Sequence, residues 1–149
     1  MSVNIHIQEE DFDTADEVAA LTTGETGAVA TFTGIVRGGD GVSALVLEHY
    51  PGMTEREIAR IAEQARARWT LIGGITIIHR IGRLNVGEHI VLVAVASAHR
   101  QSAFAACEFL MDFLKTRAPF WKQEERDGQL GWVEHRASDD AAAERWRKS

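Results

Sequence analysis

Residues 74–97 read "GITIIHRIGRLNVGEHIVLVAVAS", and they contain two apolar segments, "GITIIHRIG" at 74–82 and "HIVLVAVAS" at 89–97. Both segments are rich in Ile and Val, a composition that favours β-strands. The residues between them, "RLNVGE", form a link of hairpin length, and only antiparallel strands can be joined so briefly. This stretch therefore favours an α+β domain with a mostly antiparallel sheet over a doubly wound parallel one.

Further strands are expected on both sides of this pair, because their residues alternate or are rich in β-branched side chains. The last two expected strands can pair as a hairpin across "RDGQ" at 126–129. No linker, repeat or low-complexity run divides the chain, so residues 1–149 are expected to form a single domain. These strands are predicted at 2–7, 27–37, 43–50, 120–125 and 131–135.

Helices are expected to flank the sheet. Two of them begin at capping boxes, formed by Thr14 with Glu17 and by Thr54 with Glu57. A longer helix is predicted from about Ser102 to Thr116. The spacing of its apolar residues predicts one buried stripe that comprises Phe104, Cys107, Leu110, Met111 and Leu114.

The composition of the chain excludes several classes of protein. A net charge of −6 argues against nucleic-acid binding, which depends on a basic surface. No apolar run approaches the roughly 20 residues that cross a bilayer, and the N-terminus lacks the features of a signal peptide. One cysteine cannot form an internal disulfide. A cytoplasmic protein without membrane association is the expectation.

Three common kinds of catalytic group are missing from the sequence. Cys107 lies in mid-helix on an apolar stripe, so we expect a buried, inert thiol rather than a nucleophile. The six histidines show no metal-ligand spacing, and no metal site is predicted. The glycines of "GGDG" at 38–41 do not match a phosphate-binding loop, and no cofactor is predicted.

The remaining candidates are basic residues. His99 and Arg100 lie where the long helix is expected to begin, and a helix N-terminus already carries a partial positive charge. Their placement is favourable if an anion such as a phosphate or carboxylate binds there. Alternatively, Arg100 points to solvent or to a nearby acid. Arg37 ends a predicted strand before the glycine loop, and it is either a ligand-binding cation or an exposed loop residue.

Two lysines flank the turn in "LKTRAPFWKQEE" at 114–125. Pro119 ends the helix and redirects the chain, so that Lys122 could return beside Lys115. Two ammonium groups brought close lower one another's pKa, which would prepare one of them as a base or nucleophile. Phe120 and Trp121 could stack on a flat ring or could be core residues. The residues alone thus predict a site for a small anionic ligand, and for an aromatic one if Phe120 and Trp121 stack on it.

Four motifs carry a family resemblance that covers nearly the whole chain, from about Gly27 to Trp146. At these motifs the sequence resembles the large, catalytic subunits of molybdopterin synthase. The resemblance implies an α/β hammerhead fold and a homodimer. The motifs are "TFTGIVR" (31–37), "LEHYPGM" (47–53), "SAHR" (97–100) and "LKTRAPFWK" (114–122).

The resemblance also implies partners and a reaction. The expected partner is a small ubiquitin-like subunit that carries a thiocarboxylate on its C-terminal Gly-Gly tail, within a heterotetramer of two large and two small subunits. Two sulfurs would pass to cyclic pyranopterin monophosphate (precursor Z) and form the dithiolene of molybdopterin. Because the sulfur arrives on the partner's tail, such an enzyme needs no reactive cysteine or metal of its own.

Site residues follow from the same resemblance. Lys115 matches the family's principal catalytic lysine, and Lys122 matches the second one. Arg37, His99 and Arg100 match substrate-binding positions, and in this family the last two can reach the pocket from the other protomer. Related sequences often carry lysine where this chain has Ile35. The further positions implied to bind substrate are Phe32, Ile35, Val36, Met111, Gln123, Glu124 and Arg136.

Two competing hypotheses stand beside the synthase. The first is a non-catalytic adaptor that binds a ubiquitin-like tail; retention of both Lys115 and Lys122 argues against it, because docking alone needs no close lysine pair. The second is a phosphate-ester-binding enzyme of unknown reaction. Without the family resemblance, the residue chemistry supports no more specific function than this.

Overall fold

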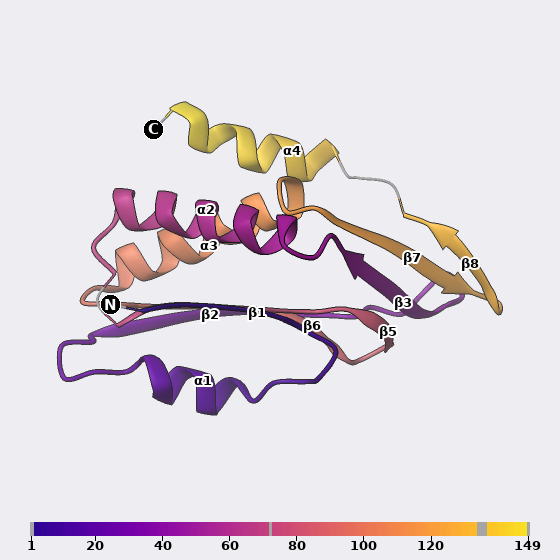
Figure 1. Cartoon of the computed structure of the whole chain (residues 1–149), viewed down its shortest axis with the longest axis horizontal. Helices are drawn as coiled ribbons and strands as arrows, with labels where there is room; N and C mark the ends of the chain where they lie inside the picture. The colour runs from indigo at the N-terminus through magenta and orange to yellow at the C-terminus, as the bar shows by residue number, and fades with distance from the viewer. Residues whose placement is uncertain (1, 72, 134–136, 149) are drawn as a thin grey trace.

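The central antiparallel pair predicted from residues 74–97 is present in the computed structural model, which describes residues 2–71, 73–133 and 137–148 (Figure 1). Strand β4 (Gly74–Arg80) pairs with β6 (His89–Ser97), in a register that runs from Gly74↔Ala96 to His79↔Val91. Nearly every side chain of both strands is buried, as the apolar composition requires.

Two more strands complete this first sheet, in the order β1-β4-β6-β2. Strand β1 (Val3–Gln8) runs parallel to β4, and β2 (Ala28–Ile35) runs antiparallel to β6. The expectation of a mostly antiparallel α+β architecture is therefore confirmed.

A second sheet, in the order β5-β3-β7-β8, lies beyond one end of the first (Figure 1). It contains β3 (Val42–His49), β5 (Gly82–Asn85), β7 (Phe120–Arg126) and β8 (Gln129–Trp132), all antiparallel. The sequence predicted one sheet and a plain link after β4, but within the described residues that link contributes β5. Gly82, with a φ of +87°, adopts a backbone conformation that other residues rarely reach, and it starts β5 just after β4 ends.

The predicted hairpin near the C-terminus is confirmed, but β8 spans Gln129–Trp132 and not 131–135, of which residues 134 and 135 lie outside the described residues. Strands β7 and β8 pair from Gln123↔Trp132 to Arg126↔Gln129, which leaves two residues in the loop. These are Asp127 and Gly128, with φ values of +49° and +80°. A two-residue Asp-Gly loop with two positive φ angles matches the right-handed twist of the strands it joins.

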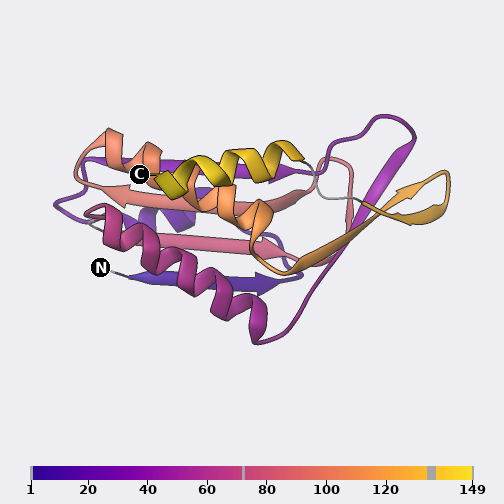
Figure 2. The ribbon, with the colours of Figure 1, turned by 90° about the horizontal axis from the view of Figure 1, so that it is seen from above.

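Helices cover both faces of the first sheet (Figures 1 and 2). Helices α2 (Met53–Arg68) and α3 (Arg100–Thr116) pack on one face, and α1 (Thr14–Leu21) packs on the other. Helix α4 (Ala137–Glu144) and the 3₁₀ helix η1 (Arg145–Lys148) lie over α3. In the described part of the chain, no helix is long and apolar enough to cross a membrane.

The main core lies between the first sheet and helices α2 and α3. Its fully buried side chains include Phe109, Leu110, Ile58, Ile61, Ile75 and Ile77. A smaller cluster of Val36, Leu45, Leu47 and Leu84 joins the second sheet to the first. The mixed order of strands and helices thus produces one sheet that is covered by helices and a second sheet beyond its end.

Both predicted capping boxes are displaced by one or two residues. Helix α1 is capped by Asp13, whose Oδ1 accepts a hydrogen bond from the Asp16 backbone N–H at 3.1 Å. Helix α2 is capped at Gly52, whose N–H donates to the Glu55 carboxylate at 3.2 Å. Thr54 is not available as a cap, because its hydroxyl bonds elsewhere.

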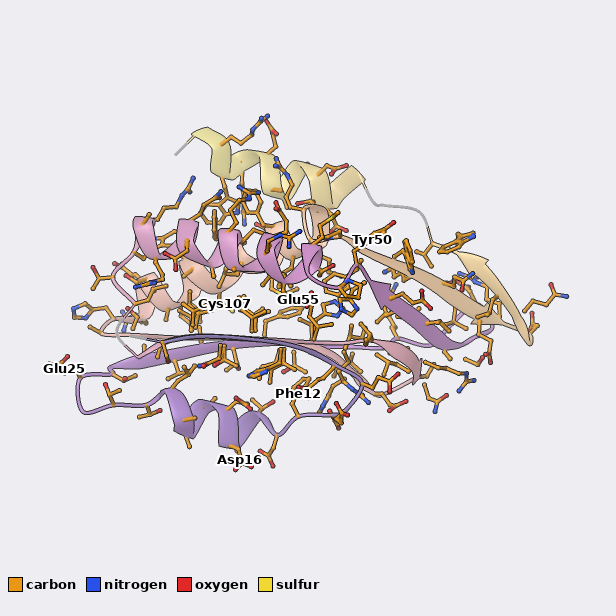
Figure 3. The ribbon with its side chains drawn as sticks, viewed as in Figure 1. Phe12, Asp16, Glu25, Tyr50, Glu55 and Cys107 are labelled. Carbon is orange, nitrogen blue, oxygen red and sulfur yellow. The ribbon has the colours of Figure 1, made fainter. Side chains whose placement is uncertain are left out.

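The predicted stripe of α3 is correct at four positions and wrong at Phe104. Cys107, Leu110, Met111 and Leu114 are buried, with Cys107 between α3 and the first sheet (Figure 3), but the Phe104 side chain is 67% exposed. Phe104 follows the buried Ala103, and a rotation of about 100° per residue takes it off the buried face.

Candidate active site

The two lysines singled out by the sequence lie near one imidazole. His79, near the end of β4, has a pKa lowered from 6.5 to about 4, chiefly because its ring is withdrawn from water. The positive charges of Lys115 and Lys122, and the imidazole of His49, lower the pKa of His79 further. We call Lys115, Lys122, His49 and His79 the basic cluster.

Each member of the basic cluster comes from a different element. Lys115 is exposed in the last turn of α3, and Lys122 is a partly buried residue of β7. Lys122 pairs with Leu47 of β3, so its side chain lies on the face of the second sheet that packs toward the first. His49 ends β3, and its Nε2 lies 3.8 Å from the Glu55 carboxylate.

The segment that joins the lysines is a tight turn. The Phe120 N–H donates to the Ala118 carbonyl at 2.9 Å, which closes a three-residue turn around Pro119. The fixed φ of proline suits this turn, and Pro119 cannot continue the helix. The prediction that the chain reverses here and returns Lys122 toward the end of α3 agrees with this geometry.

His99 and Arg100 lie at the other end of α3. His99 is the N-cap residue and makes no side-chain capping bond, and both side chains are exposed. Arg100 precedes Lys115 by 15 residues, which corresponds to roughly 22 Å along an α-helix. A single chain therefore does not bring His99 and Arg100 together with the basic cluster (Figure 2).

The predicted residues of the "TFTGIVR" motif lie along β2 and just beyond it. Strand β2 ends where β6 begins, at Ile35↔His89, which is the end of the sheet toward which α3 runs. Arg37 is exposed beyond this point, while Ile35 and Phe32 are 53% and 40% exposed on the edge strand. Val36 is different, because its side chain is only 1% exposed and packs in the core.

The remaining predicted residues are dispersed. Strand alternation places Gln123 on the opposite face of β7 from Lys122. Glu124 shares the face of Lys122 and forms an ion pair with Arg126 at 2.7 Å. Met111 is buried under α3, and Arg136 lies outside the described residues.

The sequence reasoning missed His49 and His79 as site residues. It considered the histidines only as metal ligands, and within the described ranges no group of three or more His, Cys, Asp or Glu side chains could hold a metal ion. The usable signal was His79 itself, a polar side chain near the end of a largely apolar strand.

A cavity of about 350 Å³ lies on the other face of the first sheet, between β1 and α1. Its acidic lining, which includes Asp11, Asp13, Asp16 and Glu17, would repel an anionic ligand. We therefore place the candidate site at the basic cluster and not in this cavity.

Fold and site together define a class of protein: a two-sheet α+β protein whose lysine pair suits an anionic substrate. Residues 7–117 match the family described as "MoaE protein". The chain is 56% identical over 154 residues to the molybdopterin synthase catalytic subunit of Mesorhizobium japonicum, an alignment that covers 100% of this chain and 96% of that protein. The chain belongs to the MoaE protein family.

Solved structures agree with this assignment. The MoaE protein from Burkholderia ambifaria superposes with a TM-score of 0.83 at 50% identity, covering 98% of this chain and 99% of that one. A complex of subunits 1 and 2 of the molybdopterin-converting factor from Helicobacter pylori superposes at 0.72, covering 90% and 91%. At 20% identity, the second comparison supports the fold alone.

Proposed function

We propose that this chain carries out the sulfur-transfer chemistry of molybdopterin synthase at the basic cluster, with Lys115 and Lys122 as its catalytic residues. As a member of the MoaE family it is a molybdopterin synthase catalytic subunit, an enzyme of molybdenum cofactor biosynthesis. The observation that carries the proposal is the placement of Lys115 and Lys122 on the two sides of the Pro119 turn, near the partly buried imidazole of His79.

The proposed sulfur donor is the C-terminal thiocarboxylate of a small ubiquitin-like subunit, and the acceptor is cyclic pyranopterin monophosphate. The donor sulfur bonds to a substrate carbon and displaces an oxygen substituent, whose carbon–oxygen bond breaks and which leaves with the bonding electrons. The acyl group of the tail then stays attached to the substrate through sulfur. Water then attacks the acyl carbon, the carbon–sulfur bond of the tail breaks, and the tail leaves as an ordinary carboxylate. A second round supplies the second sulfur of the dithiolene.

Both lysines have a role in this reaction. An ammonium group beside the acyl carbon stabilises the oxyanion that forms when water attacks, and it can exchange a proton with the leaving sulfur. We assign this role to Lys115, which is exposed at the end of α3. Lys122 is partly buried in β7 and is assigned to orient the anionic substrate.

The properties of Cys107 support an external sulfur source. Its side chain is 7% exposed, and burial together with the neighbouring Glu108 raises the pKa of the thiol to about 11. A thiol of this kind stays protonated near neutral pH and is a poor nucleophile. A single buried thiol is also consistent with the proposed cytoplasmic location.

We further propose that a second copy of the chain completes the site. His99 and Arg100 lie roughly 22 Å from Lys115 along α3, too far to share a small substrate in one chain. Phe104 is 67% exposed near this end of the helix, and a second copy bound here would cover it. Two such copies, each with one small subunit, would form the heterotetramer.

Single-turnover conversion of cyclic pyranopterin monophosphate tests the function. The chain is mixed with thiocarboxylated small subunit, and product is compared for wild type, Lys115→Ala and Lys122→Ala. Product from wild type but not from a folded Lys115→Ala variant is expected. A stable complex without product from wild type would contradict the proposal and favour the non-catalytic adaptor.

A further inference from the structure

The relative position of the two lysines depends on the turn between them. Only the segment from Thr116 to Trp121 separates Lys115 from Lys122, and it passes from a helix to a strand of the second sheet. Displacement of this turn would therefore move Lys122 relative to Lys115. Catalysis by positioned groups is sensitive to displacements of about 1 Å.

Thr54 of α2 holds one side of the turn. Its Oγ1 donates a hydrogen bond to the Pro119 carbonyl at 2.9 Å and accepts one from the Tyr50 N–H at 3.0 Å. The Thr54 side chain is completely buried, and a buried hydroxyl is stable only with its partners in place. Thr54 thus joins the turn to the loop before α2.

His79 of β4 holds the other side. Its ring stacks on Phe120, with ring centroids 3.8 Å apart and ring planes inclined by 17°. His79 Nδ1 lies 2.8 Å from the Arg80 carbonyl, and because a carbonyl only accepts, this nitrogen carries the hydrogen. The hydrogen bond fixes the plane of the imidazole, and the imidazole in turn fixes Phe120, two residues before Lys122.

The surroundings of this ring also favour its uncharged state. A protonated imidazole would add a third positive charge beside Lys115 and Lys122, whereas a neutral ring stacks without disturbing the charge of the pair. Burial and the two lysines both favour the neutral form. An aromatic ring without charge is therefore the feature that this position needs.

We propose that His79 and Thr54 are positioning residues that fix the turn around Pro119 and so hold Lys122 in place relative to Lys115. The inference rests on the proposed function, because it takes the lysine pair as the catalytic unit. Neither residue needs to touch the substrate.

Two pairs of variants test the inference. His79→Leu fills the space but cannot stack, whereas His79→Phe keeps an uncharged aromatic ring. Thr54→Val keeps the shape but removes the hydroxyl, whereas Thr54→Ser keeps the hydroxyl. His6→Phe is the matched control, because His6 is an exposed residue of β1 that lines the cavity on the opposite face of the first sheet.

The assay measures kcat at saturating substrate, KM, the Kd for the small subunit and the thermal midpoint. We expect His79→Leu and Thr54→Val to lower kcat by about tenfold to a hundredfold, with KM and Kd changed less than about twofold. Thr54→Ser should stay within about twofold of wild type in kcat. His79→Phe keeps the stacking on Phe120 but loses the hydrogen bond to Arg80, so it should recover most, but not all, of the kcat that His79→Leu loses. A purely structural role would not separate kcat from Kd in this way, nor be rescued by the conservative variants.

Folded His79→Leu and Thr54→Val variants with wild-type kcat would overturn the inference. Equal losses in His79→Phe and His79→Leu would overturn the stacking role. Wild type and Lys115→Ala are measured in the same assay, which distinguishes failure of the proposed function from failure of this inference. In that case wild type gives no product, or Lys115→Ala is as active as wild type.

Discussion

The imidazole of His79 lies flat on the ring of Phe120, with ring centroids 3.8 Å apart, and so joins β4 of the first sheet to β7 of the second. This contact places a titratable group at the junction of the two sheets. Its protonation state is therefore linked both to the stability of the fold and to the charge of the site.

The first prediction concerns stability at low pH. Because the pKa of His79 is about 4 when folded and 6.5 in the reference state, the unfolded chain binds more protons between these values. The free energy of unfolding should therefore fall as pH decreases from about 6.5 to about 4, with His79 contributing at most about 3 kcal/mol. Above pH 6.5 this contribution is fully present.

Urea denaturation of wild type and His79→Phe at several pH values between 4 and 7 measures this effect. Other carboxylates and histidines titrate in both proteins, so the difference between the two curves isolates His79. The free energy of unfolding of His79→Phe should fall less steeply with decreasing pH. Parallel curves for the two proteins would show that His79 ionises normally in the fold.

The second prediction concerns Cys107. Because the thiol is buried and its pKa is raised to about 11, a thiol-specific reagent should modify it only after denaturation. Cys107→Ala should retain wild-type sulfur transfer, at a cost of about 1–2 kcal/mol in stability from the lost packing. Rapid labelling of the native protein, or loss of transfer in a stable Cys107→Ala variant, would be incompatible with an inert thiol.

The third prediction concerns the shared site. If His99 and Arg100 bind the substrate that lies at the lysine pair of a second copy, a mixture of Lys115→Ala and Arg100→Ala chains contains dimers with one intact site. We expect each variant alone to be impaired, Arg100→Ala chiefly in substrate binding, and the refolded mixture to recover about a quarter of wild-type activity by random pairing. A mixture no more active than the average of the two variants would place each complete site within one chain.

The fourth prediction concerns Arg80, the one buried arginine among the described residues. Its guanidinium donates to the Glu9 carbonyl at 2.9 and 3.0 Å and to the His89 carbonyl at 3.1 Å. Arg80→Met would leave both carbonyls without this donor, and hydrogen bonds to each of them contribute about 1–2 kcal/mol. Chemical denaturation should therefore show a loss of about 2–4 kcal/mol. A loss below about 1 kcal/mol would show that water replaces the guanidinium.

The sequence was sufficient for those parts of the fold that depend on local pattern. The β4–β6 pair follows from two apolar segments with a short link, and the β7–β8 hairpin follows from Asp127 and Gly128. Strand β5 was missed because Gly82–Asn85 is short and becomes a strand only through pairing with β3. Phe104 was misassigned because its spacing fits an apolar stripe, although no described element covers it.

The candidate site likewise contains residues that a local sequence pattern indicates and residues that it does not. Lys115 and Lys122 lie close in sequence around a proline, so the local pattern and the family motifs indicated both. His79 and Thr54 act on the turn from positions 41 and 65 residues away, at Phe120 and Pro119, and no local pattern could assign them. The predicted roles of the other substrate-binding residues remain predictions.

Helix α3 begins with Arg100 and has Lys115 in its last turn, so its length fixes the spacing between the two ends. One inserted residue anywhere between them would turn the far end by about 100° and advance it by about 1.5 Å. Conservative replacements on the exposed face would leave this spacing unchanged. Insertions and deletions within α3 should therefore be far rarer among functional relatives than substitutions, whereas the loop at 38–41 is free to vary in length.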